Sequence, residues 1–262
     1  MTTLSISDPE LARSFIMTLE LPPAPARVAT RGGDDDDPVG VGAVLGPALA
    51  VGSQVTEFGA GVEPAQRKDI VNSFLVAQLA ADSFIKNVGG GANEWYERFF
   101  YVLANSGWNV DRSAQSTRDS SGSPDEIHRM VVPILTAALG TAVAAASAVV
   151  AVLNGLAASA AQRPWVALFH RTSQRASANL FQVGYVAGAT GAPPSATLSN
   201  FELTAQQSVT QVLFFRFSST QATLKYSTAK LSMNVPVFET VKPAVEERIR
   251  EHLDAFIAAV DV

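Results

Sequence analysis

The sequence has no cysteine and only three histidines in 262 residues. Without cysteine, the chain forms no disulfide, no thiolate zinc site and no thioester-linked acyl group. His128, His170 and His252 are about 40 or 80 residues apart, a spacing that does not suggest a metal site. The serine-hydrolase elbow, the P-loop and the H-E-x-x-H zinc motif are also absent. We therefore expect a protein that is not an enzyme and that binds no cofactor and no metal.

A secretory signal is also missing from the start of the sequence. The first 20 residues carry Asp8, Glu10, Arg13 and Glu20, and they lack the basic start and apolar block of a signal peptide. We expect synthesis in the cytoplasm without a signal peptide and release by a non-classical route.

Charge is unevenly distributed along the chain. Residues 1–162 hold 10 Lys/Arg and 17 Asp/Glu, residues 163–242 hold 7 and 2, and residues 243–262 hold 2 and 5. A basic block in an acidic protein suits a surface that meets phosphate head groups. Because its basic residues are not clustered and interleaved with stacking aromatics, we expect no nucleic-acid partner.

A long stretch without any charged side chain covers residues 130–162, and twelve of its 33 residues are alanine. A run of about 20 apolar residues is long enough to span a bilayer as a helix. This run is interrupted by a proline, a glycine and an Asn-Gly pair, and a capping box precedes it at residues 123–126. We interpret it as a buried hairpin of two helices, at about 123–140 and 141–154, with a transmembrane segment as the alternative.

Apolar residues at helical spacing predict further helices at residues 64–87, 93–106 and 240–260. A short helix is also predicted to begin at the Ser-Asp-Pro-Glu sequence of residues 7–10 and to end before the prolines at 22–25.

Beyond Arg163 the apolar period changes from 3.6 to 2, which is typical of strands. Loops are predicted at residues 111–122 and 188–194. A solvated acidic loop at 34–37 is favoured over a calcium site, because the ligands do not alternate around a glycine. Strands are predicted at residues 164–171, 179–188, 201–218, 222–228 and 230–238.

Five short motifs carry a family resemblance. They are PWVALF at residues 164–169, NLF at 179–181, VGY at 183–185, NFEL at 200–203 and QVLFFRF at 211–217, the last being the most specific. On these motifs the chain resembles the Cyt family of cytolytic delta-endotoxins and, more distantly, the Erwinia virulence factor family that shares their fold. The match runs from about Arg27 to Val241. The cysteine that carries an acyl chain in the virulence factor has no counterpart here.

The resemblance implies an α/β fold, a single-domain three-layer sandwich in which a mostly antiparallel sheet is wrapped by two layers of helices. Residues 27–241 would form this domain, residues 1–26 a removable leader, and residues 242–262 a C-terminal helix packed on the domain or separable from it. It further implies a soluble protoxin that is trimmed by proteases, binds membrane lipids directly and permeabilises target-cell membranes as an oligomer, with a dimer in solution.

The same resemblance suggests three groups of functional residues. Proteolytic activation is expected at Arg27 and Arg31. Head-group contact is expected at Arg171, Arg175, Lys225 and Lys230. Strands of 9–11 residues can span a bilayer when tilted, and lipid contact is expected on the apolar positions of the late strands, namely Phe201, Leu203, Val209, Leu213, Phe215, Phe217, Leu231, Met233 and Val235.

Two alternatives stay open at this point. One is a non-lytic effector or carrier that holds a fatty acid between the sheet and the helices. The other is a passive structural or storage protein that has kept the fold.

Overall fold

The computed structural model describes residues 2–4, 7–24, 48–119, 127–140, 147, 149–151, 164–174, 178–189, 192–205 and 222–259. Its helices are α1 (Pro9–Met17), α2 (Pro64–Val88), α3 (Ala92–Asn105), α4 (Ile127–Leu139), α6 (Pro164–Ser173), α7 (Val235–Ile249) and α8 (Leu253–Phe256). Its strands are β1 (Thr2–Leu4), β2 (Ala48–Val51), β3 (Gln54–Phe58), β4 (Trp108–Arg112), β5 (Ser116–Asp119), β6 (Asn179–Ala189), β7 (Ala192–Ala205), β8 (Ala222–Met233) and β9 (Ile257–Ala259).

The strands within these ranges form one nine-stranded sheet in the order β1-β4-β8-β7-β6-β3-β2-β9. β5 pairs with β8 beside the stretch that β4 leaves free, so β4 and β5 follow each other along one side of β8. The pairing of β3 with β6 is parallel, and the other pairings are antiparallel. The predicted mostly antiparallel sheet is therefore confirmed.

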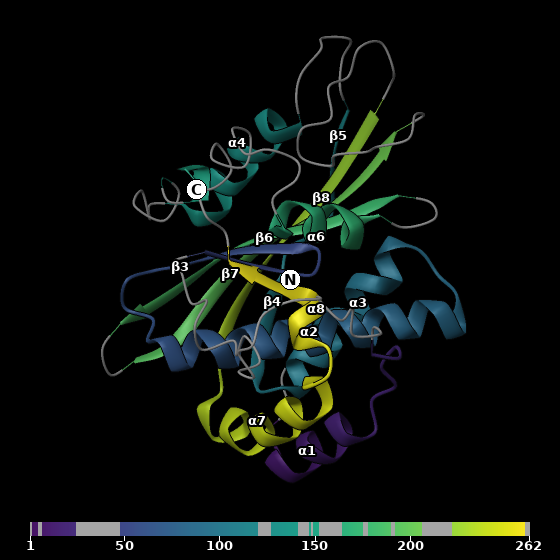
Figure 1. The fold of residues 1–262 in the computed structure, drawn as a ribbon. Coiled ribbons are helices and arrows are strands. Elements are labelled where there is room, and N and C mark those ends of the chain that lie inside the picture. Colours follow the sequence, from purple (N-terminus) through teal and green to yellow (C-terminus); the bar gives the residue numbers. More distant parts are fainter. Residues whose placement is uncertain are drawn as a thin grey trace, which may run out of the picture.

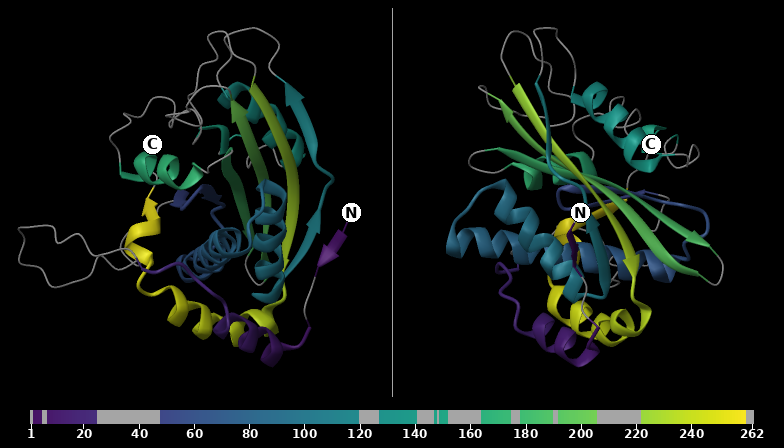
Figure 2. Two further views of the ribbon diagram at one scale, coloured as in Figure 1. Left: turned by 90° about the vertical axis from the view of Figure 1, so that its right-hand side faces the viewer. Right: turned by 180° about the vertical axis from the view of Figure 1, so that it is seen from behind.

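Helices cover both faces of this sheet (Figure 1). The rear view in Figure 2 shows the strands running diagonally between α4 on one side and α1, α2, α3 and α7 on the other. Apolar side chains face both layers because each face of the sheet must be shielded from water. The predicted α/β sandwich with two helical layers is confirmed.

The larger layer is built on α2 and α3, which match the helices predicted at 64–87 and 93–106. Trp95 of α3 and Trp108 of β4 are fully buried in the core between this layer and the sheet. The Trp108 indole N–H donates to Ser73 Oγ at 3.0 Å, so the buried ring keeps a polar partner. Gly107 ends the α3 turn at φ +88°, and a Cβ there would meet the Phe238 nitrogen at 2.7 Å.

The smaller layer contains α4 and α6. α4 lies inside the helix predicted at 123–140 and stops at Gly140, whose φ of +61° favours glycine. Residues 147 and 149–151 are helical, while most of the predicted second helix at 141–154 lies outside the described residues. Within the helices that are described, none has both the length and the hydropathy to traverse a bilayer.

The strand predicted at 164–171 is wrong, because this segment is the helix α6. Val166, Phe169 and Ser173 are buried at helical spacing, while Arg171 is exposed. A run of six apolar residues has no clear period, and Pro164 suits the first turn of a helix as well as the start of a strand.

The end of the chain differs from the prediction in two ways. The strands predicted at 222–228 and 230–238 are one strand, β8, which ends at Met233, and Val235 lies in the first turn of α7. The terminal helix predicted at 240–260 stops at Ile249, and the chain then forms α8 and the edge strand β9, which pairs with β2. Pro236 supplies the early-helix proline that starts α7 before the predicted position.

Further differences concern the loops and the first strands. The loop predicted at 111–122 is wrong in part, because β4 reaches Arg112 and β5 begins at Ser116, and pairing with β8 holds these polar residues in the sheet. β7 begins at Ala192, inside the loop predicted at 188–194, and the predicted strand residues 206–218 lie outside the described ranges. β1, β2 and β3 were not predicted, since β1 has only three residues and β2 only four, two of them alanine.

Candidate lipid-binding surface

One face of β6, β7 and β8 carries an apolar surface at the end where β7 finishes and β8 begins. We call this part of the sheet, residues 179–183, 199–205 and 222–228, the β7/β8 end. Here Phe181 lies opposite Phe201, and Phe201 lies opposite Tyr226 on the next strand. The Phe181 and Phe201 rings stack with centroids 4.9 Å apart and an interplanar angle of 15°. Leu203 and Leu224 continue this apolar face in the adjacent row.

The smaller helical layer covers this surface. Phe169 of α6 meets the Phe181 ring in a tilted edge contact at 6.1 Å. The buried side chains of α4, of Val149 and of α6 belong to the same cluster as the strand residues. The cluster consists of Ala48, Ala50, Val55, Met130, Val131, Ile134, Leu135, Val149, Val166, Phe169, Phe181, Val183, Phe201, Leu203 and Leu224.

The opposite face of the same strands is mainly polar, although Leu180 is buried on it against the larger layer. Gln54, Gln182, Asn200 and Ser227 lie directly opposite one another across β3, β6, β7 and β8, and we call them the amide row. The Gln182 amide donates to Asn200 Oδ1 at 2.8 Å, and the Asn200 amide donates to the Ser227 carbonyl at 3.3 Å. Among the described residues, Oε1 of Gln54 and Oε1 of Gln182 are buried without a hydrogen-bond partner.

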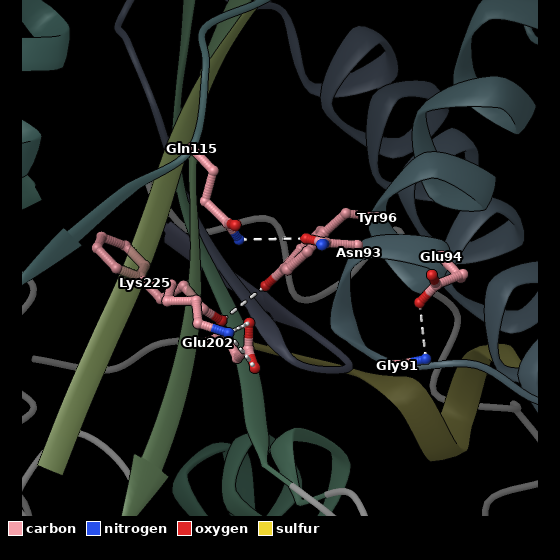
Figure 3. A network of polar contacts seen from close by, with 8 residues as sticks. Gly91, Asn93, Glu94, Tyr96, Gln115, Glu202 and Lys225 are labelled. Atoms are coloured by element: carbon pink, nitrogen blue, oxygen red, sulfur yellow. Dashed lines mark hydrogen bonds and ion pairs between the residues drawn. The ribbon is translucent and has the colours of Figure 1, made fainter.

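Beyond the amide row, the polar face continues toward the last residues of β7. Lys225 Nζ pairs with Glu202 at 3.3 Å, and the Gln115 amide donates to Asn93 Oδ1 at the start of α3 at 3.2 Å (Figure 3). The Tyr96 hydroxyl of α3 lies 2.8 Å from the Phe201 carbonyl and 3.1 Å from that of Phe181. This end of the sheet is therefore apolar toward α4 and α6 and mainly polar toward α3.

Polarity reverses in the other half of the sheet. Val186, Ala196, Leu231 and Val110 form one register row that is buried against the larger layer. On the opposite face of that half, side chains such as Lys230 are exposed. The smaller layer thus covers the half of the sheet that is apolar on its side, whereas the larger layer covers its own apolar half and, through α3, also the polar face of the β7/β8 end.

Hydrogen bonds anchor the larger layer to the strands. Gln78 of α2 accepts from the Ser53 backbone N–H at 3.0 Å and donates to the Val51 carbonyl at 2.8 Å. The Tyr96 hydroxyl of α3 donates to the carbonyls of Phe181 and Phe201. In the smaller layer, the Thr136 and Ser173 hydroxyls donate to carbonyls of their own helices. In the described part of this layer, the apolar cluster and the backbone bridge between Gln174 and Asn179 link it to the sheet.

α6 is fixed at its exposed side to the end of the chain. The Arg171 guanidinium donates to the Ala255 carbonyl of α8 at 3.0 Å. Ala255 is followed by Phe256, whose carbonyl accepts from the Gly52 N–H at 2.8 Å, and then by β9. Arg171 therefore connects the smaller layer to the C-terminal strand.

The two ends of the chain are joined on the larger layer. Ala12 and Ile16 of α1 are fully buried, and α1 lies beside α7 (Figure 1). Arg248 of α7 donates to the Leu19 carbonyl, and His252 Nε2 lies 3.0 Å from the Pro22 carbonyl. The segment that precedes the predicted cleavage positions is thus packed on the domain.

Aromatic contacts add to this junction. Phe15 of α1 meets Tyr101 of α3 edge-on at 5.4 Å. The Arg98 guanidinium lies 5.7 Å from the Phe15 ring, 5.5 Å from the Phe84 ring and 5.6 Å from the Tyr101 ring. These cation–π contacts connect α1, α2 and α3 through one side chain.

Two carboxyl groups have perturbed acidity. Burial raises the pKa of the Glu57 carboxyl to about 7, although the positive charge of Arg67 opposes the shift. Burial also raises the pKa of Asp69, against the effect of Lys242, whose ammonium lies 2.6 Å away. Asp69 and Lys242 line a small hollow between α2 and α7 that has room for about one water molecule.

The structure separates the residues that were predicted to contact lipid. Phe201 and Leu203 lie together on the apolar surface, whereas Leu231 and Met233 pack with the larger layer on the other face. Val235 is 37% exposed on α7 rather than on a strand. The remaining four, Val209, Leu213, Phe215 and Phe217, lie outside the described residues.

The predicted head-group and cleavage residues are also dispersed. Arg171 is exposed on α6, Lys225 pairs with Glu202 on the polar face, and Lys230 is exposed on the far half of β8. Arg175, Arg27 and Arg31 lie outside the described ranges.

Some residues of the apolar surface were missed at the sequence level. Phe181, Val183 and Leu224 were not proposed, although Phe181 and Val183 follow the alternation of the predicted strand at 179–188. That alternation is the signal that identifies them; the covering residues of α4 follow from helical spacing within the uncharged run.

Neither a family model nor a curated protein sequence matches the chain. Three solved structures show similarity. A delta-endotoxin is 14% identical with a TM-score of 0.36, covering 71% of this chain and 85% of its own. The activated Cyt2Ba monomer from Bacillus thuringiensis subsp. israelensis is 12% identical with a TM-score of 0.34, and the match covers 69% of this chain and 97% of that one. The Evf virulence factor is 12% identical with a TM-score of 0.33, and the match covers 77% of this chain and 80% of that one.

Proposed function

We propose that this protein binds membrane lipids directly and permeabilises membranes of target cells after proteolytic trimming and oligomerisation. The observation that carries the proposal is the apolar surface around Phe181 and Phe201. It is covered by the smaller layer, whose helix α4 lies mostly in the uncharged stretch at residues 130–162. The sequence resemblance to cytolytic delta-endotoxins supports the same function.

Energetics favour an exchange of partners at this surface. Burying a large apolar side chain is worth about 1.5–3 kcal/mol, so exposing this cluster to water would be costly. Lipid hydrocarbon can replace the helices without that cost, because it also excludes water from the strands. A membrane can therefore stabilise an open form that water does not.

The second candidate is a carrier that holds a fatty acid between the sheet and the helices. In the described part of the chain, the hollow between α2 and α7, which is lined by Asp69, Asn72, Lys242 and Glu246 as well as apolar side chains, is too small for an acyl chain. Mass spectrometry of an organic extract of the purified protein would reveal a stoichiometric fatty acid if the carrier function were correct.

Dye release from phosphatidylcholine vesicles tests the proposal. The protein is assayed untreated and after limited trypsin digestion, with the cleavage sites mapped. We expect release to rise sharply after cleavage at Arg27 or Arg31, and an Arg27→Gln/Arg31→Gln variant serves as the matched control that trypsin does not activate by this route. A folded, trypsin-resistant core that releases no dye in either state would refute the proposal.

A further inference from the structure

We infer that the uncleaved protein first docks on a phospholipid surface through the outer side of the larger layer, where the Arg98 guanidinium binds a lipid phosphate. The contact residues are Leu11, Phe15, Phe84, Val88, Arg98 and Tyr101, and we call them the Arg98 surface. This inference rests on the proposed function and adds a separate site of first contact, which needs no change in the fold.

Arg98 is a half-buried arginine at the place where α1, the end of α2 and α3 meet. Its guanidinium lies 5.7, 5.5 and 5.6 Å from the rings of Phe15, Phe84 and Tyr101, which hold it in place. Among the described residues no carboxylate forms an ion pair with it, and its Nε is buried without a hydrogen-bond partner. The two terminal nitrogens are therefore the donors left for an anion, and their planar arrangement suits the oxygens of a phosphate.

The carboxylates that lie near Arg98 along α2 and α3 have other partners. Glu94, one turn before it, accepts from a backbone N–H at the start of α3 at 2.8 Å (Figure 3). Asp82 of α2 accepts from an indole N–H at 2.7 Å. Glu97 is adjacent to Arg98 and points to another side of α3, where its charge acts on Arg112. An anion from outside the chain is thus the partner that fits this guanidinium.

Exposed apolar side chains flank the guanidinium on two sides. Leu11, one turn before Phe15 on α1, is 66% exposed, and Val88, one turn after Phe84 on α2, is 70% exposed. Residues one turn apart share a side of a helix, so these side chains extend the aromatic group around Arg98 in both directions. A soluble phosphate ester would use the guanidinium alone. Apolar side chains beside an unpaired guanidinium fit a ligand that offers hydrocarbon next to phosphate, which is a phospholipid layer.

The leader supplies part of this surface. Leu11 and Phe15 belong to α1, which precedes the predicted cleavage positions, and Tyr101 of α3 meets Phe15 edge-on. Tyr101 is 45% exposed, and an amphipathic tyrosine suits the level of the head groups. Side chains of this kind enter a bilayer by only about 5–10 Å. Docking is therefore shallow and precedes cleavage, and after trimming lipid contact passes to the apolar surface of the proposed function.

Flotation of the untreated protein with phosphatidylcholine vesicles tests the apolar part of the surface. We expect Leu11→Gln/Val88→Gln to bind at least about tenfold more weakly than the parent protein, because two exposed apolar side chains no longer enter the bilayer. Met17→Gln is the matched control. Met17 is 38% exposed on the same helix, but it lies about 200° around the axis from Phe15. Equal binding of the parent and the double variant would overturn the inference.

Arg98→Gln tests the phosphate contact. We expect binding to fall by roughly tenfold, because a charge-assisted hydrogen bond is lost, and Arg98→Lys should restore part of it. Urea unfolding shows whether each variant is folded, and the double variant at Leu11 and Val88 keeps the test valid if Arg98→Gln is not. Glycerophosphocholine is the soluble competitor. Displacement of the vesicles by millimolar glycerophosphocholine would overturn the lipid assignment in favour of a soluble phosphate ester.

The absence of cysteine allows the docked face to be mapped with single spin labels. Val88→Cys places a nitroxide on the Arg98 surface, and Ser232→Cys places one at an exposed position on the other face of the sheet. With untreated protein on vesicles, we expect the label at 88 to gain collisions with oxygen and the label at 232 to keep its collisions with a water-soluble nickel chelate. The reverse pattern would overturn the inference.

The same assays separate this inference from the proposed function. A protein that binds vesicles only after trypsin treatment, and then releases dye, would overturn docking by the uncleaved chain and leave the proposed function standing. A protein that neither binds vesicles nor releases dye in either state would remove both.

Discussion

Phe181 and Phe201 stack on one side of the sheet, and their carbonyls accept from the Tyr96 hydroxyl on the other. The same two residues thus take part in the apolar surface through their side chains and in the attachment of α3 through their backbones. This arrangement makes the two layers separable by experiment, because a substitution at Tyr96 weakens one attachment and a substitution at Phe201 weakens the other.

Tyr96→Phe removes the hydroxyl and leaves the ring. Because an intramolecular hydrogen bond contributes about 0.5–1.5 kcal/mol, we expect the free energy of unfolding to fall by about that amount. Urea denaturation followed by circular dichroism measures it. Tyr101→Phe is the matched control, since Tyr101 is 45% exposed and surface changes are usually within about 0.5 kcal/mol. An equal loss in both variants would contradict the assigned role of the Tyr96 hydroxyl.

Phe201→Ala should be far more damaging, because it empties a fully buried site beside Phe181. Removal of a buried phenylalanine ring typically costs about 3–5 kcal/mol. The expected result is a marked loss in the midpoint of urea unfolding, or no soluble protein. Leu11→Ala, at a position that is 66% exposed, provides the control and should leave the midpoint nearly unchanged. A stable Phe201→Ala protein would show that this cluster is not packed as described.

Glu57 predicts a pH dependence of stability. Its pKa is raised in the folded protein from 4.5 to about 7, so the folded state binds this proton more tightly than the unfolded state does. The stabilisation from protonated Glu57 is therefore complete below about pH 4.5 and is lost as pH rises toward 7. Glu57→Gln should remove this loss.

The measurement is the difference in free energy of unfolding between Glu57→Gln and the parent protein across pH 4 to 8. We expect the difference to shift in favour of the variant between about pH 4.5 and 7 and to level off above that. Glu247→Gln, on the exposed side of α7, serves as the control. A difference that does not vary with pH would show that Glu57 is not buried in its charged form.

Arg171 has two proposed roles that predict opposite results. As a head-group contact, its replacement by Gln should weaken binding to anionic vesicles. As the side chain that connects α6 to Ala255, its replacement should ease opening and speed dye release from zwitterionic vesicles. We expect faster release, with a loss of about 1 kcal/mol or less in stability, because the contact is exposed. Arg250→Gln is the exposed control, and slower release from both kinds of vesicle would favour the head-group role.

Long helices were predictable from the sequence because their own residues determine them. α2 carries a continuous apolar face, and its predicted bounds of 64–87 agree with the structure to within one residue at each end. α6 was not predictable in this way, because six apolar residues at 164–169 fit both periods, and packing against Phe181 decides between them.

The site was only partly predictable because it depends on strand pairing. Alternation shows that Phe201 and Leu203 share a face of β7. It does not show that Leu231 of β8 faces the opposite way, since that depends on the register between two strands. The amide row is set in the same manner, because Gln54 and Asn200 are placed in line by pairing of strands that are distant in the sequence.

The packing of α1 predicts that cutting the chain does not by itself release the leader. Ala12, Ile16 and Leu19 are at most 3% exposed, and Arg248 donates to the Leu19 carbonyl. At about 1.5–3 kcal/mol for each large side chain, these contacts should hold the cleaved segment on the domain in solution. After trypsin, we therefore expect the leader to co-elute with the domain in gel filtration and to appear as a separate peptide only under denaturing conditions.

Ile16→Glu tests this by placing a charge at a fully buried position, and it should cause the cleaved leader to dissociate and dye release to rise. Leu11→Glu introduces the same charge on the exposed side of α1 and should not. Dissociation of the unmodified leader immediately after cleavage would contradict the prediction, and it would mean that activation requires only the cut. Retention until vesicles are added would mean that the membrane itself displaces α1 from α7.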